Sequence, residues 1–328
     1  MARSGSAPYP VLGGDTLGTP TGRALKPPRA AAEAAASRGS NAWAWALLSP
    51  TLILILALGI FPLLYVLWIS THQFDGSSIL GGAFVGLDRF IAVLGADAFS
   101  NAVVVTITFL AITVPVELAL GFAMALAFYR EGRLTDRLRA FVIIPTMVAP
   151  VAIGVLWRFI YQSEIGIANF ALQALGLPAV EWLADPTIAL LSVALVDVWQ
   201  WTPFMFIILL AGLRGLPLDV VEAAQVDGAG YWRTVWNEQL PMMRGVVLIA
   251  TLMRFLDGIR TFDTIFVITR GGPAGATDVY SMATWREAFR FFNIDSAGAY
   301  SVIFLVALSL IVPFVLTRIA RFDVGGGR

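Results

Sequence analysis

The feature that most constrains this chain is a series of six apolar segments, each long enough to cross a lipid bilayer. A membrane-spanning helix needs about 20 predominantly apolar residues. Charged residues make up only 13% of the 328 residues, and the mean hydropathy is +0.78, whereas soluble proteins carry about 25% charged residues. We therefore predict an all-α membrane protein with six transmembrane helices, over residues 42–69, 101–129, 140–161, 187–213, 243–268 and 298–318.

The distribution of basic residues predicts which side of the membrane each loop faces. Fifteen of the 22 Lys and Arg residues fall in the N-terminal tail, around residues 130–139 and 214–244, and at the C-terminus. The loops on the opposite side hold only Arg89, Arg270, Arg286 and Arg290. Because Lys and Arg collect in cytoplasmic loops, we expect both termini in the cytoplasm.

The apolar segments divide the chain into four parts. Residues 1–41 are rich in Ala, Gly, Ser and Pro without apolar periodicity, so we predict a disordered cytoplasmic tail. Residues 42–86 comprise the first transmembrane helix and an outer loop, and that helix is too long for a signal-peptide core. A five-helix core follows over residues 87–322, and residues 323–328 form a cytoplasmic C-terminal tail.

A polar stretch, residues 218–241, separates the fourth and fifth apolar segments on the predicted cytoplasmic side. Asp219 followed three residues later by Glu222 matches a capping box, which predicts that a short helix begins there. Gly228 accepts the left-handed conformation that closes a helix, so this helix should end beside it.

The second half of this stretch predicts another short helix, which carries Trp232 and Trp236 one turn apart and ends at Pro241. Together the two helices would form a hairpin, apolar on one side, that projects from the membrane. We interpret it as a docking element for a cytoplasmic partner. A hairpin that only lies along the lipid headgroups, as amphipathic helices often do, is the alternative.

The sequence contains no motif for hydrolysing ATP or binding a metal. A phosphate-binding loop needs a Lys beside Gly-rich backbone, and the single Lys, Lys26, lies in the tail. There is no Cys, and the single His is His72, so we expect no metal site. Neither HExxH nor GxSxG occurs. We therefore predict a transport protein without catalytic residues rather than an enzyme.

Charges within the apolar segments mark a candidate solute site. An ionised group at membrane depth costs at least about 2.5–3.5 kcal/mol, so it normally faces the protein interior or water. Arg254, Asp257 and Arg260 recur every three residues in the fifth segment, and Asp257 can therefore contact both arginines on one helix face. Gly258 and Thr261 extend that face.

The fourth segment supplies aromatic rings on which a sugar can lie. Three rings, those of Trp199, Trp201 and Phe204, surround the amide of Gln200. Sugars are bound by hydrogen bonds from polar groups and by flat contact with such rings. The fourth and fifth segments together thus carry the chemistry that a sugar site needs.

The polar stretch resembles a known motif. Its EAA sequence at 222–224, followed by Gly228 and then by Leu240 and Pro241, is similar to the EAA loop in the membrane-spanning subunits of ATP-binding-cassette (ABC) importers. The DGA sequence at 227–229 narrows the resemblance to permeases of the carbohydrate-uptake type.

A second motif follows in the expected order. Phe262 and Asp263, then the TRGGP sequence at 269–273 and Thr277, resemble a signature of the MalF-like half of those transporters. The resemblance covers roughly residues 87–322. It implies a type I ABC importer (MetI-like) permease fold in the bacterial inner membrane, with a cytoplasmic coupling helix.

The resemblance also implies site residues. It implies ATPase-coupling contacts from Glu222, Ala223, Ala224, Asp227, Gly228, Leu240 and Pro241. It implies a solute pocket lined by Trp199, Gln200, Trp201, Phe204, Arg254, Gly258 and Thr261, to which the spacing adds Asp257.

The partners follow from the same resemblance. A MalF-like permease works with a second, MalG-like permease subunit, with two copies of a cytoplasmic ABC ATPase that bind ATP and Mg²⁺, and with an extracytoplasmic solute-binding protein. We expect no cofactor in this chain and no nucleic-acid partner.

The solute is expected to be a sugar or a sugar-derived molecule. A guanidinium at Arg254 favours a phosphorylated, sulfonated or carboxylated sugar or polyol, because Arg matches planar anions. An ion network of Arg254, Asp257 and Arg260 that contacts no solute is the alternative. An ion-coupled secondary transporter that uses Asp257 and Glu117 is a different class. Glu117 and Asp197 are either proton carriers, or charges that are paired or lie in water-filled crevices.

Overall fold

The computed structural model describes residues 43–74, 82–129 and 132–324. The tail predicted over residues 1–41 lies outside the described residues, as do the last four residues of the chain. The described residues divide into two units, one that ends at Pro62 and one that begins at Leu63. The described residues are helical almost throughout, in agreement with the predicted fold class.

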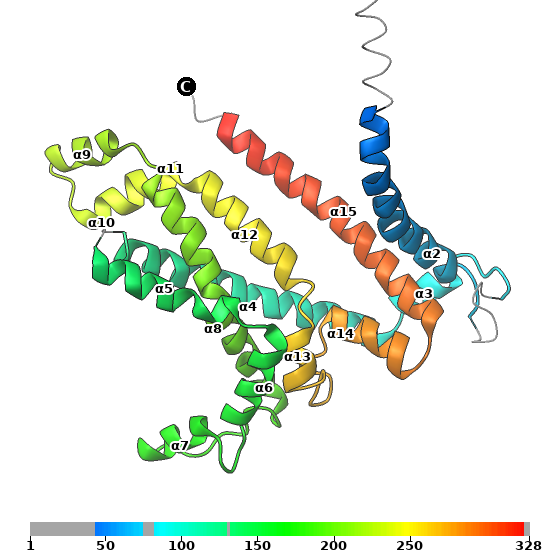
Figure 1. The fold of residues 1–328 in the computed structure, drawn as a ribbon. Coiled ribbons are helices and arrows are strands. Elements are labelled where there is room, and N and C mark those ends of the chain that lie inside the picture. The colour runs from blue at the N-terminus through cyan, green and yellow to red at the C-terminus, as the bar shows by residue number, and fades with distance from the viewer. Residues whose placement is uncertain (1–42, 75–81, 130–131, 325–328) are drawn as a thin grey trace, which may run out of the picture. The chain divides into compact units, whose positions relative to one another are not determined.

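The first candidate span is the helix Trp43–Ser70, which contains a π-helical turn, η1 (Leu56–Ile60), and ends as α2 (Phe61–Ser70). The other helices are shown in Figure 1. They are α3 (Asp88–Leu94), α4 (Asp97–Ala127), α5 (Arg133–Met147), α6 (Pro150–Ile160), α7 (Ile167–Ala174), α8 (Pro186–Arg214), α9 (Leu218–Val226), α10 (Tyr231–Thr234), η2 (Val235–Gln239), α11 (Leu240–Met242), α12 (Arg244–Gly258), α13 (Asp263–Ile268), α14 (Tyr280–Trp285), η3 (Arg286–Arg290) and α15 (Ile294–Val324).

Four helices in the described part are long and apolar enough to cross a membrane. They are Trp43–Ser70, α4, α8 and the segment Ile294–Phe314 of α15. Two further candidates are pairs of helices joined at a sharp bend, so the number of spans reaches six only if each pair counts as one. The long apolar segments of the sequence thus correspond to helices, although not all of them are straight.

The third predicted span, residues 140–161, is not one continuous helix. It combines part of α5 with α6, and the two helices are bent by 93°. Val148 and Ala149 lie between them with extended ψ angles of 136° and 134°. Pro150 explains this, because a proline disfavours the helical conformation of the residue before it. The prediction of a continuous helix was wrong at this point.

The fifth predicted span, residues 243–268, is also interrupted. α12 ends at Gly258, and α13 begins only at Asp263. Phe262, just before α13, has non-helical φ and ψ angles of −142° and −56°. At its other end α12 meets the helical segment Tyr231–Met242 at a bend of 69°. The prediction of one helix over this range was therefore wrong.

α8 is the central helix of the second unit. In the apolar stretch of α8, 67% of the residues are buried, compared with 39% in that of α4. The most extensive contact of α8 is with α4. Gly121 permits this contact, because a Cβ atom there would lie 2.7 Å from the Cβ of Met205 and 3.0 Å from the backbone N of Phe206. The core around this contact includes Phe109, Met205, Phe206 and Leu209.

Replacing Gly121 by Ala should weaken the α4–α8 contact, because the added methyl group would overlap backbone that cannot move aside. We expect Gly121→Ala to lower the thermal unfolding temperature of the detergent-purified protein, at a cost of about 1–3 kcal/mol. Gly59→Ala is the matched control, since a Cβ atom at Gly59 meets no atom within 4 Å. Equal unfolding temperatures for the two variants would contradict the close approach of α4 and α8.

Candidate functional site

A polar pocket of about 260 Å³ lies at the break between α12 and α13. Two larger pockets, of about 660 and 680 Å³, have mainly apolar walls. The polar pocket instead offers carboxylate, guanidinium and hydroxyl groups, which can form hydrogen bonds with a hydroxylated solute. Its walls are formed by Pro150, Trp201, Asp257, Arg260, Thr261, Phe262, Asp263 and Thr264.

Three of the predicted solute-binding residues line this pocket. Trp201 comes from α8, Asp257 from the last turn of α12, and Thr261 from the break that follows. The fold therefore brings one aromatic ring, one carboxylate and one hydroxyl from both predicted segments into the same small volume.

Three other predicted residues on α8 lie elsewhere. Trp199 lines one of the larger apolar pockets. Gln200 is buried, and its side-chain amide donates to the carbonyl of Val148 at 3.4 Å. Phe204 packs edge to face against Trp201, with ring centroids 6.3 Å apart. Successive residues of a helix point about 100° apart, so a run of neighbouring aromatic residues cannot share one pocket wall.

Gly258 has a spacing role at the end of α12. A Cβ atom at Gly258 would lie 2.7 Å from the side chain of Leu110 on α4 and 3.0 Å from Nη1 of Arg254. The absence of a side chain therefore leaves room for the guanidinium of Arg254 next to α4.

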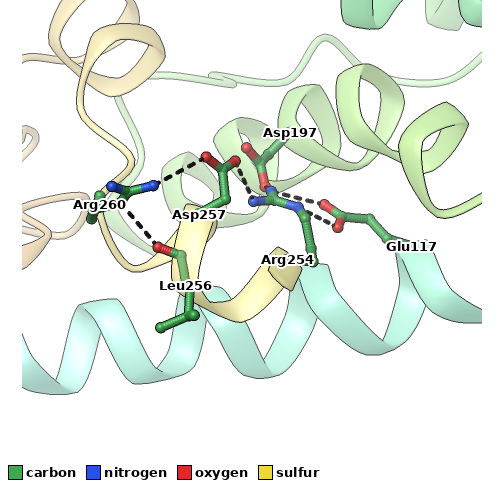
Figure 2. A network of polar contacts seen from close by, with 6 residues as sticks. All are labelled: Glu117, Asp197, Arg254, Leu256, Asp257 and Arg260. Carbon is green, nitrogen blue, oxygen red and sulfur yellow. Dashed lines mark hydrogen bonds and ion pairs between the residues drawn. The ribbon is translucent and has the colours of Figure 1, made fainter. Parts of the chain in front are cut away.

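Arg254 is the largest fully buried side chain among the described residues, and three carboxylates surround it (Figure 2). Its Nε donates to Glu117 at 2.6 Å, and its Nη2 donates to Glu117 at 3.1 Å and also to Asp197. Nη1 donates to Asp257 at 3.3 Å. The carboxylates come from α4, α8 and α12, so this ion cluster joins three helices.

This geometry argues against direct recognition of an anion by Arg254. The guanidinium has five N–H donors, of which four are engaged by the carboxylates, and the side chain is 1% exposed. The predicted contacts of Asp257 with both arginines are present, at 3.3 Å to Arg254 and 3.9 Å to Arg260. Arg260 is 66% exposed and Asp257 is 47% exposed. The buried residues that pair with Arg254 are therefore on other helices.

Glu117 and Asp197 are these partners, and the interpretation of both residues as paired charges is confirmed. Sequence spacing relates Arg254 only to residues of its own helix, whereas Glu117 and Asp197 lie 137 and 57 positions away. The one available signal was that an ionised side chain inside an apolar segment needs an opposite charge. That signal identifies Glu117 and Asp197 as candidate partners of a buried cation, but it does not predict which charges form a pair.

The predicted hairpin over residues 218–241 is present, and Gly228 ends its first helix as predicted. Gly228 has a φ angle of +81°. Its amide donates to the carbonyl of Gln225 at 3.0 Å, and the amide of Ala229 donates to the carbonyl of Ala224 at 2.9 Å. These two bonds form a Schellman motif, which satisfies carbonyl groups at the end of α9.

Two details of the hairpin prediction were wrong. α9 begins after Pro217 without a side-chain cap, so Asp219 and Glu222 do not form a capping box. Asp219 lies in the first turn instead, where a negative charge still favours the helix dipole. The second helix does not end at Pro241, because α10 continues through the π-helical turn η2 into α11, where Pro241 occupies the first turn.

The hairpin exposes large apolar side chains. α9 buries none of its residues, and five residues are between 56% and 88% exposed, namely Leu218, Val226, Tyr231, Trp232 and Trp236. Exposed apolar clusters of this kind mark interaction surfaces. Of the predicted coupling residues, Glu222, Ala223, Asp227, Gly228 and Pro241 are exposed, whereas Ala224 and Leu240 are half-buried.

The second family motif forms a tight loop between α13 and α14. The hydroxyl of Thr277 lies 2.7 Å from both the Thr269 hydroxyl and the Gly272 carbonyl, which closes the loop. Next to it, Asp278 pairs with Arg286 at 2.6 Å. Burial raises the pKa of the Asp278 carboxyl, and the neighbouring Arg286 opposes that rise.

Known proteins resemble the chain over most of its length. Residues 117–323 match the family described as "Binding-protein-dependent transport system inner membrane component". The chain is 35% identical over 275 residues to the trehalose/maltose transport system permease protein MalF of Thermococcus litoralis, covering 83% of this chain and 92% of that protein. It is 31% identical over 284 residues to the trehalose transport system permease protein SugA of Mycobacterium tuberculosis, covering 87% and 90%.

A solved structure has a similar fold. One chain of a bacterial alginate ABC transporter, in complex with an alginate pentasaccharide-bound periplasmic protein, matches with a TM-score of 0.74 at 20% sequence identity. The match covers 84% of this chain and 93% of that one.

The family match covers more than half of the chain, and both relatives exceed 30% identity across most of their own length. The two motifs that pointed to this family lie on the hairpin and on the loop after α13. The chain therefore belongs to the inner-membrane components of binding-protein-dependent transport systems, among their MalF-like, carbohydrate-uptake ABC permeases.

Proposed function

We propose that this chain is one permease subunit of an ATP-driven importer that moves a sugar or a sugar-derived solute across the bacterial inner membrane. Six spans would place both termini and the hairpin on the cytoplasmic side. A MalG-like second permease, two ABC ATPases with ATP and Mg²⁺, and an extracytoplasmic solute-binding protein would complete the transporter. The trehalose and maltose in the relatives' names support a sugar as the solute.

The single observation that carries the coupling role is the exposed hairpin. α9 buries none of its residues within this chain, yet its fold is fixed by the hydrogen bonds that close it at Gly228. A hydrogen-bonded helix with an exposed apolar surface is suited to bind an ATPase and to transmit its movement to the membrane helices. Closure of two ATPases around ATP would move this helix, and a loaded binding protein must in turn favour the state that hydrolyses ATP, because coupling between sites is reciprocal.

The pocket favours an uncharged, polyhydroxylated solute. The ring of Trp201 offers a flat surface, and the Thr261 hydroxyl offers a hydrogen-bond partner. An acidic solute would need a free guanidinium, whereas Arg254 is held by three carboxylates. Arg260 is accessible, but the carboxylates of Asp257 and Asp263 line the same pocket, so negative groups outnumber it there.

An ion-coupled secondary transporter is the competing function. It would require Glu117 or Asp197 to take up and release an ion during transport. Both side chains are buried and bound to Arg254, which leaves neither of them open to water in this conformation. The exposed hairpin would also have no role in such a transporter, so we favour coupling to ATP.

The coupling role can be tested at Glu222, which is exposed on α9. We expect Glu222→Ala to reduce solute-stimulated ATP hydrolysis and uptake by at least about tenfold in the reconstituted transporter, because a charge-assisted contact with the ATPase contributes roughly 1.5–3 kcal/mol. Glu164→Ala is the matched control, since Glu164 is exposed in the loop between α6 and α7. Full activity of Glu222→Ala in a transporter that remains folded would contradict the docking role.

The solute site can be tested at Thr261. We expect Thr261→Val to raise the KM for uptake of trehalose or maltose by up to about tenfold, because one hydrogen bond contributes roughly 0.5–1.5 kcal/mol. Thr251→Val is the matched control on the preceding helix, α12, since the Thr251 hydroxyl donates to the Val247 carbonyl at 2.7 Å and lies outside the pocket. An equal KM for the two variants would remove Thr261 from the solute site.

A further inference from the structure

Two buried carboxylates lie one contact away from the polar pocket without forming its walls. Glu117 is 0% exposed and Asp197 is 2% exposed, so neither can touch a solute in the pocket in this conformation. Both bind the guanidinium of Arg254, which in turn contacts two residues of the pocket wall. Any influence of these carboxylates on the solute must therefore pass through Arg254.

Arg254 contacts two walls of the pocket. Its Nη1 donates to the Asp257 carboxylate at 3.3 Å, and its Cζ lies 5.4 Å from the ring centroid of Trp201. This second distance is within the range of a cation–π interaction. A shift of Arg254 would therefore change its contacts with both the Asp257 carboxylate and the Trp201 ring, which line the pocket.

The charges of the cluster do not balance when all its groups are ionised. Arg254 and Arg260 provide two positive charges, and Glu117, Asp197 and Asp257 provide three negative charges. Interactions between charges are stronger in the protein interior than in water. When all five groups are ionised, this excess of negative charge opposes an anion in the pocket.

We propose that Glu117 and Asp197 are specificity-determining residues of this importer. They neutralise Arg254 and hold it beneath Asp257 and Trp201, so that the pocket admits uncharged solutes and rejects anions. This inference rests on the proposed role of the pocket as the solute site. Without either carboxylate, the charge of Arg254 would be felt in the pocket, and the pocket would attract anions.

The natural absence of Cys permits a direct measurement of the charge in the pocket. Thr261→Cys places a single thiol on the pocket wall. Its labelling rate is measured with two methanethiosulfonate reagents of similar size, one carrying a trimethylammonium group and one carrying a sulfonate group. The ratio of the two rates cancels any change in thiol reactivity or access that both reagents share.

With Glu117 and Asp197 intact, we expect the cationic reagent to react faster than the anionic one. Adding Glu117→Gln or Asp197→Asn should shift the ratio toward the anionic reagent by about a hundredfold, because one unit charge acting over roughly 10 Å at an effective dielectric constant of about 20 changes each rate by about tenfold, and the two rates change in opposite directions. Asp295→Asn is the matched control, because Asp295 is a buried carboxylate paired with Arg89 at 2.8 Å and does not line the pocket.

A double variant separates the effect of charge from that of a structural brace. Glu117→Gln/Arg254→Gln removes one negative and one positive charge, so we expect the ratio to return toward the value of the Thr261→Cys background. If Glu117 and Arg254 acted only as a structural brace, the labelling ratio of this double variant would differ from that of the Thr261→Cys background by more than the ratio of Glu117→Gln alone. Thermal unfolding of each purified variant shows whether it is folded.

Three outcomes would overturn the proposal: an unchanged ratio in folded Glu117→Gln and Asp197→Asn, a double variant that does not return, or loss of folding in both single variants. The labelling requires neither solute nor ATP. Failure of the transporter to move any sugar would therefore contradict the proposed function while the labelling ratio still reports on Glu117 and Asp197. An unchanged ratio with normal sugar uptake would remove only this inference.

Discussion

The ion pairs around Arg254 constrain the rest of the structure, because a charge buried at membrane depth must be matched by charges from whatever helices lie beside it. Glu117 on α4 and Asp197 on α8 meet this requirement for Arg254 on α12. Removing one partner of a buried ion pair typically costs about 3–5 kcal/mol, so the three helices are held in a defined register. Gly121 and Gly258 allow the close approach that these contacts need.

The same three-helix arrangement relates the pocket to the hairpin. α8 carries Trp201 and ends at Arg214, four residues before the hairpin begins, and the hairpin leads through Met243 into α12. α12 carries Arg254 and Asp257. The two helices that flank the hairpin in the chain therefore each contribute a residue to the pocket wall, Trp201 from α8 and Asp257 from α12. A displacement of the hairpin would act on both walls through covalently connected helices.

The sequence was sufficient to predict the helical nature of the chain, its apolar segments, the hairpin, and the end of α9 at Gly228. Each of these features depends on local composition and spacing. The bend before Pro150 and the break after Gly258 could not be predicted from hydropathy, which is continuous across both. Trp201, Asp257 and Thr261, which were predicted to line one pocket, line the same polar pocket, and their contact with a solute stays a prediction. The partners of Arg254 on other helices, Glu117 and Asp197, were not identified, because pairing between helices depends on how they pack and not on spacing along one of them.

The most direct test of the account is to identify what the hairpin touches in the assembled transporter. A photo-crosslinking amino acid at Val226, which is 88% exposed on α9, would capture a neighbour in membranes that contain the complete system. We predict capture of the cytoplasmic ABC ATPase. Capture of lipid alone, or of the extracytoplasmic binding protein, would contradict the central claim that this hairpin couples the permease to ATP hydrolysis.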